Sequence, residues 1–142
     1  MKIILKGIHR PDDAITAARS GYIDAIIVSN HGGRQLDSAP SSIMMLKPIV
    51  NELKYNNLYN KIEVYLDGGV RRGSDIFKAI ALGAKAVFIG RPVLWGLATG
   101  GKEGIFKVYE LLKREFINTM MLCGCNSVKD INEDFIFKKP KF

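Results

Sequence analysis

Four short apolar runs recur along the chain, and they limit its possible folds more than any other feature. Each run is rich in branched residues and none alternates cleanly with polar ones; the runs are Ile3 to Leu5, Ala25 to Val28, Ile62 to Leu66 and Ala86 to Ile89. Short continuous apolar runs are typical of strands that are buried on both faces, as in a parallel sheet. The sequence therefore predicts four buried, parallel strands.

Helical patterns separate these runs. Pro11 suits a first helical position, and Gly21 is a typical helix end. The remaining expected helices begin at Pro40 with Ser41 and Ser42, at Ser74 as an N-cap with an end at Gly83, and at about Lys102 with an end near Leu122. Each strand is thus expected to be followed by a helix.

This β-α alternation predicts right-handed crossovers and a parallel α/β sheet. A complete (β/α)8 barrel takes about 250 residues, so four β-α units in 142 residues amount to about half of one. An open, doubly wound sheet is the alternative. We predict a single partial domain over residues 1–142, four parallel strands each followed by a helix, with a C-terminal helical tail.

Composition narrows the possible partners. The chain is 47% hydrophobic and 25% charged, which is typical of a globular protein, and its apolar stretches are too short to cross a bilayer. The formal charge of +7 raises the question of nucleic acid, but lysines and arginines are spread along the chain without an interleaved aromatic stripe. We expect neither a membrane nor a nucleic-acid partner.

The chain has two cysteines, Cys123 and Cys125, separated only by Gly124. This spacing fits neither an ordinary disulfide framework nor a zinc site, which needs more ligands. We therefore expect reduced thiols in an intracellular compartment and no metal site.

Two glycine-rich segments that follow the third and fourth runs predict a phosphate site. Glycines at 68, 69, 73 and 90 allow the backbone N–H groups to approach an anion closely. Arg71 or Arg72, together with Arg91, supplies charged donors, and the helix expected at Ser74 adds positive potential. In (β/α)8 barrels, phosphate commonly binds after strands seven and eight, which these two runs would be in a C-terminal half.

The segment after the second run has different chemistry. His31 carries an imidazole that can accept a proton, and Arg34 follows after two glycines that let the loop fold back. A guanidinium there can bind a carboxylate with two hydrogen bonds. Lys6 is expected at the end of the first strand, where a cation would stabilise negative charge on a ligand, whereas His9 is interpreted as structural.

Ser-Asn-His-Gly-Gly-Arg-Gln-Leu-Asp at 29–37 resembles the active-site motif of the FMN-dependent 2-hydroxy-acid oxidases, a family that includes glycolate oxidase, lactate oxidase, mandelate dehydrogenase and flavocytochrome b2. The resemblance continues in Leu-Asp-Gly-Gly-Val-Arg-Arg-Gly at 66–73 and in Ala-Leu-Gly-Ala-Lys-Ala-Val-Phe-Ile-Gly-Arg-Pro at 81–92. Three motifs at consistent spacing are more specific than any single glycine-rich loop.

The resemblance implies a (β/α)8 fold, FMN as cofactor, and oxidation of a small (S)-2-hydroxy acid such as glycolate or lactate to the 2-oxo acid, with oxygen as acceptor. By position, it implies that His31 is the catalytic base and that Arg34 binds the substrate carboxylate. The residues it implies to contact FMN are Lys6, Ser29, His31, Asp67, Gly68, Gly69, Val70, Arg71, Gly90 and Arg91.

The sequence departs from this family by lacking the N-terminal half. We therefore expect either part of an oxidase or a truncated, catalytically incompetent fragment that oligomerises or binds a phosphate ligand weakly. We expect the exposed edges of the sheet to pair with a second copy of the chain or with an N-terminal half. A further alternative for the family is another phosphate-binding barrel, similar to inosine-monophosphate dehydrogenase. The resemblance implies a peroxisomal location. The chain ends Lys-Lys-Pro-Lys-Phe instead of the peroxisomal signal Ser-Lys-Leu, so a cytoplasmic location is the alternative.

Overall fold

The computed structural model describes residues 1–137, so the prediction about the C-terminal targeting signal falls outside the described residues. Strands and helices alternate, and two short 3-10 helices form the tail. The elements are β1 Ile4–Ile8, α1 Pro11–Ser20, β2 Ala25–Val28, the 3-10 helix η1 His31–Gly33, α2 Ser42–Tyr55, β3 Glu63–Leu66, α3 Gly73–Ala81, β4 Ala86–Val87, α4 Arg91–Leu122, η2 Val128–Asp130 and η3 Glu133–Phe135.

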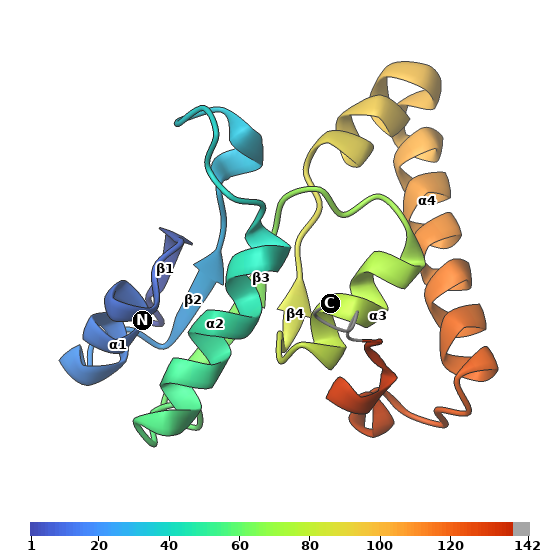
Figure 1. Cartoon of the computed structure of the whole chain (residues 1–142). Helices are drawn as coiled ribbons and strands as arrows, with labels where there is room; N and C mark the ends of the chain where they lie inside the picture. Colours follow the sequence, from blue (N-terminus) through green and yellow to red (C-terminus); the bar gives the residue numbers. More distant parts are fainter. Residues whose placement is uncertain (138–142) are drawn as a thin grey trace.

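The strands form one parallel sheet in the order β1-β2-β3-β4, as Figure 1 shows. Ala25 pairs with Ile4 on one side and with Glu63 on the other, and Tyr65 pairs with Ala86. The strand order follows the sequence without a reversal, whereas a doubly wound sheet reverses its order at a switch point. The predicted four-stranded parallel sheet is therefore confirmed, and its sequential order favours a barrel segment over the doubly wound alternative.

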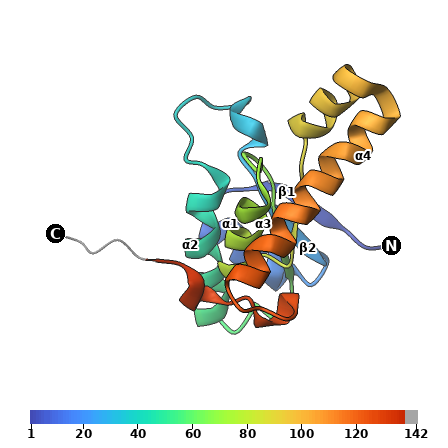
Figure 2. The ribbon, with the colours of Figure 1, turned by 90° about the vertical axis from the view of Figure 1, so that its right-hand side faces the viewer.

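The main hydrophobic core lies between the sheet and its helices. Ile26, Val28, Val64 and Leu66 share one sheet face and are at most 2% exposed. They pack in one cluster with residues of the helices, including alanines of α1 and apolar residues of α2. Figure 2 shows α1, α2 and α3 on the same side of the strands. The helices therefore cover a single face, and that face fixes the sheet in position.

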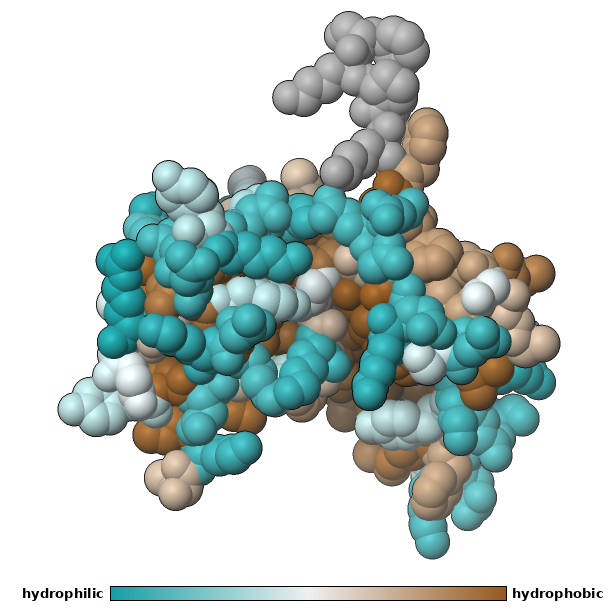
Figure 3. Space-filling view, turned by 90° about the horizontal axis from the view of Figure 1, so that it is seen from below, coloured by the Kyte–Doolittle hydropathy of each residue, from teal (hydrophilic) through white to brown (hydrophobic). Residues whose placement is uncertain are grey.

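The other sheet face is only partly covered, so the prediction that all four strands are buried on both faces is wrong. Only β2 is buried throughout; on the face opposite the helices, Ile4 of β1 is 48% exposed and Phe88 after β4 is 44% exposed. The physical reason is that burial depends on a covering layer, and no helix of residues 1–137 covers this face. Figure 3, seen from the end where the strands begin, shows hydrophobic side chains between hydrophilic ones.

Helix boundaries follow local signals in α1 but not in α3. The bounds of α1 are as expected, with Pro11 in its first turn and Gly21 in the left-handed conformation at its end. The predicted N-cap Ser74 is wrong, because α3 begins at Gly73 and Arg72 occupies the N-cap position. Carboxylates from Asp75 and Glu115 replace the expected serine cap. Asp75 Oδ2 accepts hydrogen bonds from the N–H groups of Arg71 (3.0 Å) and Arg72 (2.9 Å).

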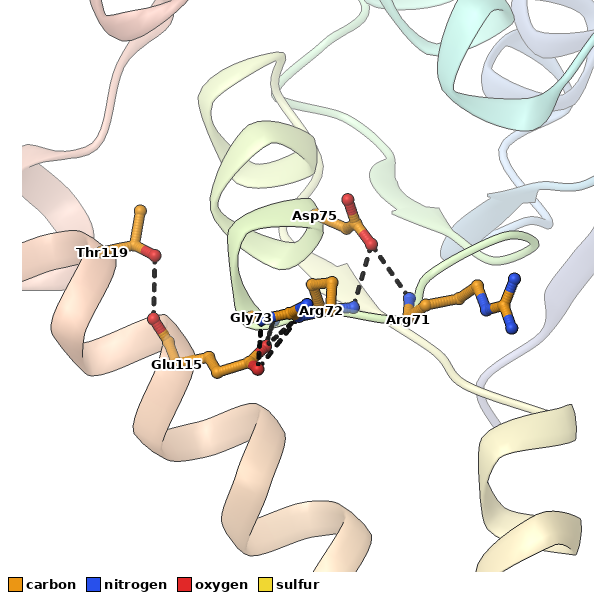
Figure 4. A network of polar contacts seen from close by, with 6 residues as sticks. All are labelled: Arg71, Arg72, Gly73, Asp75, Glu115 and Thr119. Atoms are coloured by element: carbon orange, nitrogen blue, oxygen red, sulfur yellow. Dashed lines mark hydrogen bonds and ion pairs between the residues drawn. The ribbon is translucent and has the colours of Figure 1, made fainter.

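The second carboxylate comes from α4 and joins the two helices (Figure 4). Glu115 accepts a hydrogen bond from the Gly73 N–H at 2.8 Å and forms an ion pair with the Arg72 guanidinium at 2.9 Å. These contacts lower the pKa of Glu115, with the Arg72 hydrogen bond as the largest cause and the Gly73 N–H as the next. The start of α3 is thus attached to α4.

The last long helix differs from the prediction of a helix from about Lys102. It begins at Arg91 and is interrupted at Gly100 and Gly101, which have non-helical backbone angles. Gly96 and Gly104 approach so closely across this break that a Cβ on Gly104 would lie 1.9 Å from the Gly96 carbonyl oxygen. Small residues therefore let α4 fold back on itself. Within residues 1–137, no helix has the length and apolarity needed to cross a membrane.

Gly73→Ala tests the α3–α4 contact. A Cβ at this position would lie 2.1 Å from the Phe116 backbone nitrogen, so the helices must separate. We expect a loss of about 1–3 kcal/mol in the free energy of unfolding, measured by urea denaturation followed by circular dichroism. Ser74→Ala is the control, because the Ser74 hydroxyl makes no hydrogen bond with any of residues 1–137, and it should change stability by less than about 0.5 kcal/mol. Equal stability of Gly73→Ala and the parent chain would contradict the contact.

Candidate active site

The segments singled out in the sequence meet at one rim of the sheet, where its parallel strands end. Figure 1 shows the loop after β2, the loop after β3 and the start of α4 together at the top of the molecule. Two contacts join them directly: Lys6 on β1 reaches Asp67 after β3, and Arg91 at the start of α4 reaches Gly32 in the β2 loop. The rim is the expected position for an active site in a parallel α/β protein.

Lys6, Ser29 and Asp67 form a polar trio across three strands. Lys6 Nζ lies 3.1 Å from Ser29 Oγ, to which it donates, and 3.1 Å from Asp67 Oδ2. Ser29 is buried, and the Asp67 side chain is 18% exposed. The prediction placed Lys6 after β1, but the strand extends to Ile8 with an irregularity between Lys6 and Ile8. Lys6 therefore lies within the strand and still reaches the rim.

Asp67 has an unused acceptor. Its Oδ1 atom is buried and makes no hydrogen bond among the described residues, although Oδ2 pairs with Lys6. A buried carboxylate oxygen without a partner is costly and points to a missing donor. Two glycines of the loops after β3 and β4 border open space, since a Cβ built on Gly69 or on Gly90 would meet no atom within 4 Å. A polyol hydroxyl is the kind of donor that would satisfy this oxygen.

His31 lies in an unusual backbone conformation at this rim. It opens η1 with a φ of 56°, and its N–H donates to Ser29 Oγ at 3.1 Å. Left-handed angles are costly for residues other than glycine and are concentrated at functional sites. The imidazole is exposed, so it is accessible to a ligand bound at this rim. The Ser29 hydroxyl therefore connects the histidine loop to Lys6.

The structure distinguishes between the two candidate phosphate arginines of the β3 loop. Arg72 is paired with Glu115 and turned toward α4, while the Arg71 guanidinium lies 5.2 Å from the centre of the Trp95 ring. Figure 4 shows the Arg71 side chain pointing away from the Arg72–Glu115 pair. Arg71 is thus the arginine available to a ligand. The expected contribution of the α3 N-terminus is weakened, because Asp75 and Glu115 already accept hydrogen bonds from its first N–H groups.

Arg91 connects the far side of the rim to the histidine loop. Its Nη2 donates to the Gly32 carbonyl oxygen at 2.7 Å. Of the five N–H donors of a guanidinium, only this one is used by a described residue, so the others remain available for an anion. Val70, in contrast, is 5% exposed and packs in the main core. Any ligand contact at Val70 would therefore come from its backbone.

Arg34 is the predicted site residue that the structure does not bring into contact with the others. It follows η1 and is exposed, and its guanidinium makes no hydrogen bond or ion pair with the described residues. It shares the loop of His31 and the rim. This arrangement leaves its donors available to a small anion.

Two residues near the site were not singled out by the sequence. Asn30 bonds to the Gly33 N–H, and its own N–H donates to the Ser42 hydroxyl at 3.1 Å. The available signal was weak: asparagine is common where a side chain stabilises a turn, and Ser42 was expected only as part of a helix start. Neither signal indicates that the two residues meet.

The family is identified by comparison with known proteins. Residues 1–138 match the FMN-dependent dehydrogenase family model. The chain is 51% identical over 140 residues to 2-hydroxyacid oxidase 1 of Mus musculus, covering 99% of this chain and 36% of the relative. It is 52% identical over 136 residues to L-lactate oxidase of Nostoc sp., covering 96% and 36%. A peroxisomal (S)-2-hydroxyacid oxidase of Arabidopsis thaliana is 49% identical over 136 residues, with 96% and 36% covered.

Solved structures agree with this relationship. A mandelate oxidase variant superposes with a TM-score of 0.86 at 44% identity, covering 94% of this chain and 39% of that one. A flavocytochrome b2 variant superposes with a TM-score of 0.90 at 37% identity, covering 99% and 39%. The chain thus spans 36% of the curated relatives named above. The matching family model and the relatives at about 50% identity show that the chain belongs to the FMN-dependent dehydrogenase family.

Proposed function

We propose that these residues form the part of an FMN-dependent 2-hydroxy-acid oxidase that carries the catalytic base, the substrate-carboxylate arginine and the FMN ribityl-phosphate site. The observation that carries the proposal is the convergence of Lys6, Ser29 and Asp67 at the rim from which the His31 loop emerges. The family relationship supports the same reaction class. Because the chain spans 36% of 2-hydroxyacid oxidase 1 of Mus musculus, the proposal concerns one portion of the catalytic unit.

The fold proposed here is the C-terminal half of a (β/α)8 barrel. The sequential strand order, the single helix-covered face and the exposed opposite face support it. In a closed barrel the uncovered face becomes the packed interior. In the proposed barrel, Ile4, Ile27 and Tyr65 face the interior, because they share the sheet face opposite to the helix-facing core residues.

FMN fits the residues present at the rim. Asp67 Oδ1 provides a buried acceptor for a ribityl hydroxyl, and Gly69 and Gly90 leave open space in the loops that follow β3 and β4. Arg71 and Arg91 provide charged donors for the phosphate. Lys6 supplies positive charge for the flavin ring, as the resemblance implies. When bound, FMN accepts the two electrons and one hydrogen that the substrate loses.

The remaining chemistry belongs to the side chains of the β2 loop. The Arg34 guanidinium binds the substrate carboxylate with parallel hydrogen bonds, which orients the hydroxyl-bearing carbon. His31 then accepts the proton released as the 2-hydroxy acid becomes a 2-oxo acid. Molecular oxygen would then take up the electron pair together with two protons and leave as hydrogen peroxide. The substrate class is a small (S)-2-hydroxy acid of the glycolate or lactate type, in keeping with the names of the relatives.

A second candidate function follows from the exposed apolar side chains. Leu94, Leu97 and Phe106 of α4 are each more than half exposed, and β1 exposes Ile4 at an open sheet edge. Open edges and apolar patches favour association. The 142-residue chain alone is thus proposed to bind FMN weakly and to pair with a second copy or with an N-terminal half. A peroxisomal location, as named for the Arabidopsis relative, is likewise a proposal.

The two adjacent arginines give a test of the FMN site. In a chimera, this chain replaces the matching third of mouse 2-hydroxyacid oxidase 1. Arg71→Ala should weaken FMN binding about tenfold or more, because a charge-assisted hydrogen bond is lost. Arg72→Ala is the matched control and should keep the FMN affinity, since Arg72 pairs with Glu115. Flavin fluorescence titration measures both, in the chimera and in the 142-residue chain. Equal weakening by both variants would refute the assignment.

His31→Ala tests the base in the same chimera. We expect the rate of flavin reduction by glycolate to fall about 10²–10⁴-fold, which is the usual contribution of general base catalysis. FMN should stay bound, because Asp67, Arg71 and Arg91 are unchanged. Stopped-flow absorbance gives the rate, and His9→Gln is the control histidine. A His31→Ala chimera that reduces its flavin at the parent rate would exclude this histidine as the base.

Arg34→Lys tests the substrate carboxylate site. A lysine keeps the charge but loses the second parallel hydrogen bond of the guanidinium. We expect KM for glycolate to rise about tenfold or more, from the loss of one charge-assisted hydrogen bond. Arg19→Lys, at the end of α1, is the control for a distant arginine. Steady-state kinetics of both chimeras decide the matter, and a KM unchanged in Arg34→Lys would remove Arg34 from the substrate site.

A further inference from the structure

The loop that carries His31 and Arg34 is fastened at both of its ends by two side chains. The Asn30 N–H donates to Ser42 Oγ at 3.1 Å, and the Ser42 hydroxyl lies 3.5 Å from Asn30 Oδ1. Asn30 Nδ2 also donates to the Pro40 carbonyl oxygen at 3.3 Å. Asn30 directly follows Ser29 at the end of β2, whereas Ser42 is the first residue of α2. We call this pair the Asn30–Ser42 clamp.

The clamp is well shielded. Ser42 is 1% exposed, so water does not compete for its hydroxyl. Its third side is closed by the β3 loop, because a Cβ on Gly68 would lie 3.0 Å from Ser42 Oγ and 3.2 Å from Asn30 Oδ1. Gly68 therefore allows the loop after β3, residues 67–72, to pack against the clamp. We call this segment the cofactor loop. The histidine loop and the cofactor loop share this contact.

The clamp encloses a strained stretch of backbone. His31, Gly32 and Gly33 have φ values of 56°, 68° and 72°. Such a conformation persists in a histidine only when its surroundings hold it. Asn30 Oδ1 accepts from the Gly33 N–H at 3.3 Å, and Ser29 Oγ accepts from the His31 N–H at 3.1 Å. The hydrogen bonds that fix the stretch thus come from the residues just before it, which the Ser42 hydroxyl holds in place.

We propose that Asn30 and Ser42 are positioning residues for the proposed oxidation, because they hold the left-handed His31 turn and fold the loop so that Arg34 returns to the same mouth. This inference rests on the proposed function for its catalytic meaning. The clamp itself is defined by contacts within the chain. Neither residue touches the substrate in this proposal, and each acts through the loop.

The first test reads the loop without any cofactor. Hydrogen exchange followed by mass spectrometry is measured on the FMN-free 142-residue chain. Ser42→Ala should lower protection of the N–H groups in residues 30–33 about two- to tenfold, the usual worth of one hydrogen bond, and leave the 73–81 peptide unchanged. Ser41→Ala is the matched control, because Ser41 is exposed and its side chain makes no cap hydrogen bond.

The second test separates positioning from simple stability. In the FMN-loaded chimera, Ser42→Ala should slow flavin reduction at saturating glycolate about 10–100-fold, since a misplaced catalytic group is costly. Asn30→Ala should do the same. Asn30→Asp keeps the Oδ1 acceptor for the Gly33 N–H but loses the Nδ2 donor to the Pro40 carbonyl oxygen, so its rate and protection should lie between those of Asn30→Ala and the parent. A structural role alone would not order the variants in this way.

The outcomes separate the two ideas. Unchanged exchange in residues 30–33, or an equal loss in the 73–81 peptide, overturns the clamp. A local loss of protection with an unchanged reduction rate overturns its positioning role. If instead the parent chimera binds no FMN or ignores glycolate, the proposed function fails, while the exchange experiment still decides whether the clamp holds the loop.

Discussion

The contact of Lys6 with Ser29 and Asp67 is the interaction on which the arrangement of the site depends. It joins the carboxyl ends of β1, β2 and β3, with Lys6 Nζ 3.1 Å from each partner. Partly buried charges need such pairing, because desolvation of either alone is costly. The His31 loop starts just after Ser29, and the cofactor loop starts at Asp67. Both loops therefore take their positions from this trio, and the helices behind the sheet supply the rigid support.

The fold could be predicted where local chemistry decides it. Pro11 and Gly21 mark the ends of α1 because one residue fixes φ and the other tolerates the left-handed conformation. The burial of β1 could not be predicted in this way. Ile4 is as apolar as the residues of β2, yet it is 48% exposed because no layer formed by residues 1–137 covers its face of the sheet. Apolarity shows that a residue prefers burial, but the covering layer lies elsewhere in sequence or in another chain.

The site could be predicted as a set of loops but not as a set of contacts. Ser29 and Asp67 follow neighbouring parallel strands, which end at the same rim, while Lys6 reaches the two side chains from within β1. Arg71 and Arg72 are neighbours of the same type, and Glu115, distant in sequence, selects between them. The same holds for Ser42, which the sequence marks only as a residue at a helix start, whereas the structure places its hydroxyl against the Asn30 N–H. Long-range pairing of polar groups is what the sequence pattern lacked.

The free carboxylate oxygen of Asp67 shows how stability and function are related at this site. Oδ1 is buried without a partner among the described residues, and such an oxygen typically costs about 1–3 kcal/mol. The Lys6 ion pair compensates the charge through Oδ2 but leaves this second oxygen unsatisfied. A ligand hydroxyl that donates to Oδ1 would recover the lost hydrogen bond. A ligand that binds only the folded state also stabilises it, so we expect the chain to be most stable when a ribityl hydroxyl donates to Asp67 Oδ1. The free energy recovered by satisfying this oxygen then contributes to the affinity for the ribityl chain.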